Sequence, residues 1–88
     1  MNPYLVPFEV DRETTRGIVL RNVGPEKLRG VSLMLTGAGL MPLVHAAVLP
    51  PATALRVQVR GADLALDSAI IVRWLRPDGS EYLWRIVF

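Results

Sequence analysis

The chain contains no cysteine and only one histidine, His45, among its 88 residues. Disulfide bonds and thiolate metal sites are therefore excluded, as is a conventional zinc site built from cysteine and histidine. His45 lies in an apolar stretch with no acidic residue beside it, which favours a surface or hydrogen-bonded structural role over catalysis or metal binding. We expect no cofactor. The absence of cysteine does not decide the compartment.

Long apolar runs are also missing, although 51% of the residues are hydrophobic. No stretch approaches the roughly 20 apolar residues that a membrane-spanning helix needs, so we expect no membrane insertion. Residues 1–4 provide neither the positive charge nor the apolar run of a signal peptide. We expect a cytoplasmic protein if the chain is complete, and an exported or cell-surface one if it is a module of a longer protein.

Motifs for catalysis and phosphate binding are absent as well. The glycines form neither a phosphate-binding loop nor a dinucleotide-binding fingerprint. Ser32, Ser68 and Ser80 lie in strand or turn contexts without a nucleophile elbow. We therefore expect a non-catalytic protein rather than an enzyme.

Two groups of acidic residues could offer oxygen ligands to a calcium ion. Neither group has the spacing of an EF-hand loop, and arginines lie beside the first group. A solvated, salt-bridged strand edge is the favoured interpretation, and we expect no metal site. The two groups are Glu9, Asp11 and Glu13, and Asp63 and Asp67.

The segment 68–88 is predicted to form one β-hairpin. Its turn, Pro77-Asp78-Gly79, suits a type I turn followed by a glycine with positive φ, which makes Arg76 face Ser80. Residues paired across a hairpin share a face, so this turn places most large apolar groups, both tryptophans included, on the core side. The predicted pairs are Trp74 with Tyr82, Val72 with Trp84, Ile70 with Ile86, and Ser68 with Phe88.

Five further segments alternate between apolar and polar residues and are predicted strands. In the first, Tyr4, Val6, Phe8 and Val10 are expected to face the core, and Pro7 belongs at a sheet edge because it lacks a donor. The segment 62–67 is predicted to cross between two sheets. The five strands are 4–11, 15–23, 31–36, 43–49 and 53–60.

Seven short strands, separated by turn signals at intervals of roughly 8 to 12 residues, indicate an all-β fold. We expect a single domain, residues 1–88, that forms an antiparallel β-sandwich with Greek-key connections. A small barrel made from the same strands is the alternative. Leu40, Met41 and Leu43 in the apolar loop 37–43 either form an exposed patch for a partner or fold back and cap the sandwich, and capping is the favoured interpretation.

Two stretches resemble bacterial immunoglobulin-like modules such as the CARDB group. The run 18–24, followed by 31–35, is similar to a strand-Asn-x-Gly-strand pattern, and 49–57 is similar to their proline-containing turn and following strand. The corner 66–69 resembles the one before the penultimate strand of immunoglobulin folds. The resemblance implies an immunoglobulin-like sandwich that acts as a spacer or binding domain.

The face predicted to point outward mixes arginines with apolar residues, whereas a freely solvated sheet face shows cleaner polar alternation. Either a partner or a second copy covers this face, or the arginine stems lie across their apolar neighbours. The face also includes Val19, Arg21, Met34 and Val87. Its candidate interaction residues are Arg56, Arg60, Ile71, Arg73, Leu75, Leu83 and Arg85.

These residues predict a non-catalytic protein-interaction or accessory domain that binds a protein partner or self-associates as a homodimer. The alternative is a basic module for nucleic acid or an acidic glycan, contacted by Arg56, Arg60, Arg73 and Arg85. The net charge of only +2 and the nearby Glu81 count against that alternative.

Overall fold

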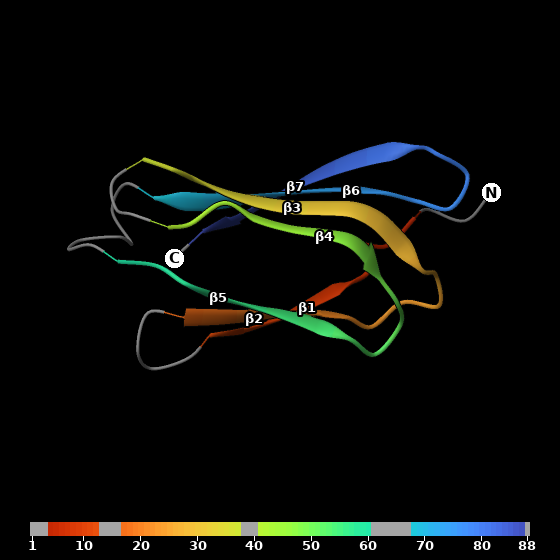
Figure 1. Cartoon of the computed structure of the whole chain (residues 1–88), viewed down its shortest axis with the longest axis horizontal. Coiled ribbons are helices and arrows are strands. Elements are labelled where there is room, and N and C mark those ends of the chain that lie inside the picture. The colour runs from red at the N-terminus through yellow and green to blue at the C-terminus, as the bar shows by residue number, and fades with distance from the viewer. Residues whose placement is uncertain (1–3, 13–16, 38–40, 61–67, 88) are drawn as a thin grey trace.

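The computed structural model describes residues 4–12, 17–37, 41–60 and 68–87, and these residues form seven β-strands in two antiparallel sheets (Figure 1). Sheet A has the order β1-β2-β5, and sheet B has the order β4-β3-β6-β7. The strands are β1 (Phe8–Arg12), β2 (Gly17–Asn22), β3 (Leu28–Thr36), β4 (Val44–Leu49), β5 (Ala54–Gln58), β6 (Ala69–Leu75) and β7 (Glu81–Val87). The all-β prediction is confirmed.

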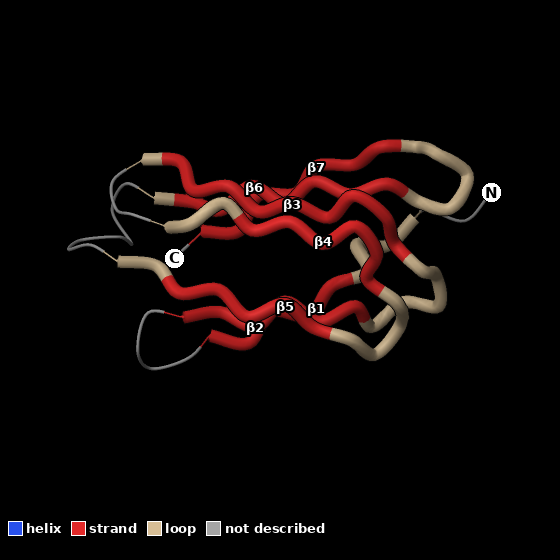
Figure 2. The backbone as a smooth tube through the Cα atoms, viewed as in Figure 1, coloured by secondary structure: helices blue, strands red, loops and turns tan. Residues whose placement is uncertain are grey.

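The two sheets form two layers with the core between them (Figure 2). Sheet A contributes Phe8, Ile18, Leu20 and Val57, which alternate with outward residues as the period of two requires. Phe8 packs edge-on against Trp74 of sheet B, with ring centroids 4.9 Å apart. Sheet B contributes Leu28, Val31, Leu33, Leu49, Ile70, Val72, Trp74 and Ile86.

The predicted hairpin register is confirmed, because Trp74 pairs with Tyr82, Val72 with Trp84, and Ile70 with Ile86. The turn is also as predicted: the Arg76 N–H donates to the Ser80 carbonyl at 2.9 Å, and Gly79 has a φ of 89°. Trp74 is only 1% exposed, whereas Trp84 is half-buried and packs against the core. The predicted pair of Ser68 with Phe88 lies outside the described residues.

The first strand is shorter than predicted, because it begins at Phe8 rather than at Tyr4. The expectation that Val6 faces the core is wrong, since its side chain is 42% exposed. Pro7 cannot donate to a ladder, and its carbonyl instead accepts from the Val23 N–H at 2.8 Å, which holds this segment beside the β2–β3 loop. The edge position of this strand is confirmed, since β1 is an edge strand of sheet A, although Pro7 itself precedes the strand.

The third strand is longer than predicted, because it begins at Leu28 and continues through a β-bulge. Gly30 has a φ of 54°, and the register against β6 shifts between Arg29 and Ser32. A positive φ favours glycine, and the extra residue returns both Leu28 and Val31 to the core. The alternation from Val31 onward did not reveal this feature.

Two expectations concern loops. The capping role of 37–43 is confirmed for Met41, which packs against the core, and is wrong for Leu43, which is 76% exposed. Leu40 lies outside the described residues. The predicted crossing segment 62–67 lies outside the described residues. No helix within the described ranges has the length and apolar character to cross a membrane.

Candidate interaction surface

The structure divides the seven candidate residues between the two sheets. Arg56 lies on β5 of sheet A and Arg60 follows that strand, whereas the other five residues lie on β6 and β7 of sheet B. Because the core lies between the sheets, their outer faces point in opposite directions (Figure 2). The sequence pattern identified outward positions, but it could not assign each strand to a sheet.

The outer face of sheet B is the more apolar of the two. Leu83, Met34 and Val87 expose 64%, 54% and 51% of their surface, and half-buried Ile71 and Leu75 accompany them. Residues paired across strands bring these groups together. The rows across the sheet are Arg29–Leu75–Glu81, Ser32–Arg73–Leu83, Met34–Ile71–Arg85 and Thr36–Ala69–Val87.

The charges on this face do not cancel. The guanidinium of Arg73 donates to Glu81 at 2.6 Å, and both side chains are about half exposed. Arg29 and Arg85 make no hydrogen bond or ion pair with any described residue. Three arginines against one glutamate leave the described part of the face with two positive charges beside its apolar centre.

The outer face of sheet A carries balanced charges instead. Arg21 lies opposite Glu9, and Val19 lies between Asp11 and Arg56 in the next row. Glu9 is thus placed beside an arginine and Asp11 beside Val19, while the acidic candidates at 13, 63 and 67 lie outside the described residues. Among the described residues, no group of three metal-ligating side chains comes together.

A shallow pocket of about 490 Å³ lies where the segment before β1 meets the β2–β3 loop and the end of β6. Its apolar wall includes Leu5 and Val23, which are 78% and 53% exposed. Its polar groups are Tyr4, Glu26 and Arg76, and the remaining lining residues are Val6, Pro7, Gly24 and Pro25.

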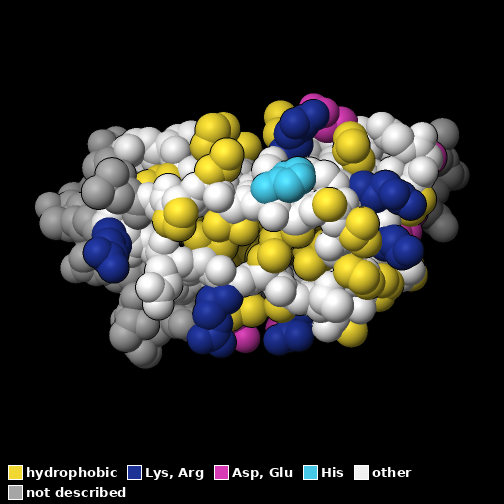
Figure 3. All heavy atoms as spheres, viewed as in Figure 1, with side chains coloured by type: hydrophobic (Ala, Val, Ile, Leu, Met, Phe, Trp, Pro, Cys, Tyr) yellow, Lys and Arg dark blue, Asp and Glu magenta, His cyan; other side chains and the backbone are white. Residues whose placement is uncertain are grey.

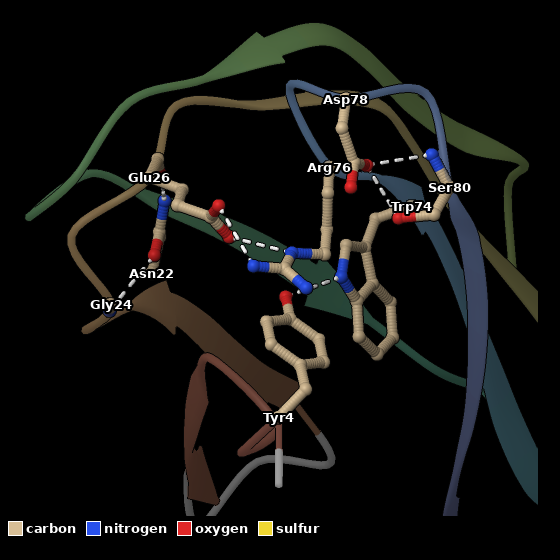
Figure 4. A network of polar contacts seen from close by, with 8 residues as sticks. All are labelled: Tyr4, Asn22, Gly24, Glu26, Trp74, Arg76, Asp78 and Ser80. Carbon is tan, nitrogen blue, oxygen red and sulfur yellow. Dashed lines mark hydrogen bonds and ion pairs between the residues drawn. The ribbon is translucent and has the colours of Figure 1, made fainter. Parts of the chain in front are cut away.

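Figure 4 shows how these polar groups satisfy one another. Arg76 donates from Nε and Nη2 to the two carboxylate oxygens of Glu26, at 3.0 and 3.1 Å. Its guanidinium carbon also lies 4.1 Å from the centroid of the Tyr4 ring, and the Tyr4 hydroxyl accepts a hydrogen bond from Trp74 Nε1 at 3.1 Å. These contacts attach the chain before β1 to sheet B.

This network was not predicted from the sequence. Ile70, Val72 and Trp74 alternate along β6 and are all buried, and Arg76 is the next residue in that alternation. An arginine at such a position indicates that its charge is paired with another group of the same chain. Its partner Glu26 is 50 residues away in the sequence, and nothing in the spacing pointed to it.

Asn22 anchors the adjacent loop and is fully buried. Its side-chain amide donates to the carbonyls of Glu26 and Leu49, both at 2.9 Å, and its side-chain oxygen accepts from the Gly24 N–H at 3.0 Å. Each polar atom of the side chain therefore has a partner, which is what burial of an amide requires.

Contacts at this end of the fold shift the pKa of three groups. Hydrogen bonds to the Glu26 carboxylate raise the pKa of Arg76 above its usual value. Burial, with a further contribution from the Glu26 carboxylate, raises the pKa of Tyr4 above its usual value of 10.0, although the hydrogen bond from Trp74 opposes the shift. Hydrogen bonds from the Ser80 hydroxyl and backbone lower the pKa of Asp78, which stabilises the hairpin turn with a charged carboxylate.

His45 and Arg60 lie along the side of the molecule where β4 and β5 form the sheet edges. His45 is exposed on β4 opposite Ser32, and Arg60 lines a small hollow with Met41, Pro42 and Gln58. Figure 3 shows hydrophobic side chains along the middle of this side and basic side chains toward its margins.

No protein-family model matches this chain, and no curated protein or solved structure matches it either.

Proposed function

We propose that this chain is a non-catalytic protein-interaction domain that contacts a partner protein through the outer face of sheet B. The observation that carries the proposal is the exposure of Leu83, Met34 and Val87, each more than half accessible, on β3 and β7 of the same sheet face, with β6 between them. Exposed apolar side chains that lie together and are bordered by arginine are typical of protein contact surfaces.

The charges of this face define the partner. Arg29 and Arg85 have no hydrogen bond or ion pair among the described residues, and Arg73 is already paired with Glu81. A partner with an apolar centre and acidic groups at its rim would complement this arrangement. Self-association through the same face would bring together two surfaces that each carry an excess of positive charge, which is unfavourable at low salt.

An immunoglobulin-like sandwich with Greek-key connections belongs to the same proposal. The chain passes from sheet A to sheet B between β2 and β3 and again between β5 and β6, and it returns between β4 and β5. The hydrogen bond between Asn22 and Gly24 gives a structural role to the Asn-x-Gly pattern that carries the resemblance to CARDB-like modules.

The alternative function is binding of nucleic acid or an acidic glycan. Such a polymer is held by several free cationic groups on one surface. Arg56 and Arg60 belong to the sheet A side, Arg73 and Arg85 belong to sheet B, and Arg73 is paired with Glu81. These placements favour the protein-interaction function.

The test is site-specific photo-crosslinking in cells of the organism whose genome encodes the chain. A photoreactive amino acid at Leu83 is expected to give discrete protein adducts that resist nuclease and glycosidase treatment. The matched control carries the same group at Arg21, which is exposed on the outer face of sheet A, and is expected to give none of these adducts. Adducts that disappear on nuclease or glycosidase treatment would support the alternative, and identical adducts at both positions would contradict the assigned face.

A further inference from the structure

The two sheets have four edge strands, and three of them carry charged side chains. β1 contains Glu9, Asp11 and Arg12, β5 contains Arg56, and β7 contains Glu81 and Arg85. Charges on an edge strand discourage pairing with another chain, because a charged side chain is poorly accommodated against a neighbouring strand. The fourth edge, β4, contains only Val44, His45, Ala46, Ala47, Val48 and Leu49.

β4 also lacks other forms of edge protection. It contains no proline, and its register with β3 runs from Leu28↔Leu49 to Leu33↔Val44 without a shift. Within the described part of the chain, no strand pairs with its free side. By contrast, the carbonyl of Val87, the last residue of β7, accepts a hydrogen bond from the Arg12 side chain at 2.6 Å.

The sequence around β4 is nearly palindromic. Reading outward from Ala46, the residues are His45 and Ala47, then Val44 and Val48, then Leu43 and Leu49. In an antiparallel pair of identical strands related by a two-fold axis at Ala46, these residues lie opposite one another across the two copies. The valines and leucines then pair with residues of their own kind, and no charged side chain enters the pair.

We propose that β4 pairs antiparallel with β4 of a second copy of this chain, around a two-fold axis at Ala46. The pairing satisfies the free backbone groups of both edges and covers Val48 and Leu43, which are 40% and 76% exposed in one copy. On β3, the strand next to β4, Arg29 lies opposite Val48. One strand therefore separates this charge from the proposed contact.

The pairing would join two copies of sheet B into one continuous sheet. Both outer faces, with Met34 and Leu83, would then lie on the same side of that sheet, because strands paired in one sheet share their faces. The inference does not depend on the proposed function, since the β4 edge and the outer face of sheet B can be changed separately.

Molar mass measured by light scattering over a wide concentration range tests the pairing. For the native chain we expect a rise from 9.7 kDa toward twice that mass. Ala47→Lys, a charge at an exposed position of β4, is expected to stay monomeric, whereas Leu83→Lys, the same charge on β7, is expected to dimerise like the native chain. A native chain that is monomeric throughout would overturn the inference, as would a dimer that persists in Ala47→Lys. Loss of the dimer only in Leu83→Lys would overturn it too, and would assign self-association to the outer face.

A disulfide test locates the two-fold axis and remains informative if a lysine variant fails to fold. The native chain has no cysteine, so a single introduced cysteine can form a protein disulfide only with the same cysteine of a second copy. Only a residue on the axis lies opposite itself, at the separation of about 4.5–5.5 Å that a disulfide accepts. Under mild oxidation, Ala46→Cys is expected to form a covalent dimer much faster than Ala54→Cys, which lies on the β5 edge. Equal rates for the two variants would contradict the pairing.

Discussion

Arg76 and Glu26 form a bidentate ion pair that joins the end of β6 to the loop between β2 and β3, with N–O distances of 3.0 and 3.1 Å. Two parallel hydrogen bonds to a carboxylate fix the orientation of the guanidinium, and here they hold it against the Tyr4 ring. The pair is less exposed than the Arg73–Glu81 pair on sheet B, with side-chain exposures of 28% and 29% against 53% and 47%.

Glu26→Gln is expected to lower the thermal midpoint of unfolding, because it removes the charge that Arg76 faces. Glu81→Gln is the matched control, and its effect is expected to be smaller because solvent screens the more exposed pair. Scanning calorimetry of both variants at low salt measures the difference. Equal midpoints for the two variants would show that the Arg76–Glu26 pair contributes nothing beyond an ordinary surface pair.

Tyr4→Phe is expected to destabilise the fold by about 1–3 kcal/mol, because it leaves the indole N–H of buried Trp74 without its acceptor. Urea unfolding at neutral pH measures this loss. The raised pKa of Tyr4 also predicts a pH dependence: its contribution is complete below pH 10.0 and is lost as the pH rises through the folded-state value. The difference between native and Tyr4→Phe stability should therefore shrink in strong alkali, and a difference that stays constant would contradict the assignment.

Asn22→Asp is expected to destabilise the fold by at least about 3 kcal/mol at neutral pH, because a buried carboxylate oxygen would face the carbonyls of Glu26 and Leu49. Burial and those carbonyls should raise the pKa of the introduced carboxyl, so the variant should recover part of its stability as the pH falls through that value. Chemical denaturation at several pH values, with the native chain at the same pH as reference, measures the recovery. A deficit that is independent of pH would mean that the amide donors are not the source of the effect.

Ala52→Gly is expected to stabilise the fold by about 0.5 kcal/mol. Ala52 has a φ of 65°, which costs a non-glycine residue about 1–2 kcal/mol, and relief of that strain exceeds the added entropy of the unfolded chain. Ala54→Gly, two residues later in β5, is the control and should destabilise the fold, since its backbone is already extended. Urea unfolding of both variants tests the opposite signs.

The local features of the fold were predictable where a few adjacent residues determine the backbone. Pro77, Asp78 and Gly79 defined the turn, and the turn defined the register of β6 and β7 and the burial of Trp74. The bulge at Gly30 was not predicted, because Gly30 precedes the alternating run 31–36 and a single glycine there does not show that its φ is positive.

The candidate surface was predictable only in part. Alternation identified Arg56 and Arg85 as outward residues, but their separation onto opposite sheets depends on pairing between strands far apart in the chain. The exposure of β4 at a sheet edge has the same origin. The near-palindrome around Ala46 is visible in the sequence, yet it has a structural meaning only once β4 is known to be an edge strand.

The most direct test of the proposed function uses the partner protein that crosslinking identifies, purified without the crosslink. Its affinity for the native chain, Leu83→Glu and Arg21→Glu is measured by calorimetry at low and high salt. We expect Leu83→Glu to weaken binding at least about tenfold and Arg21→Glu to leave it unchanged, because only Leu83 lies on the outer face of sheet B. An interface with an apolar centre should also depend only weakly on salt. Binding that resists Leu83→Glu and weakens steeply with salt would contradict the account and would favour recognition of an anionic polymer.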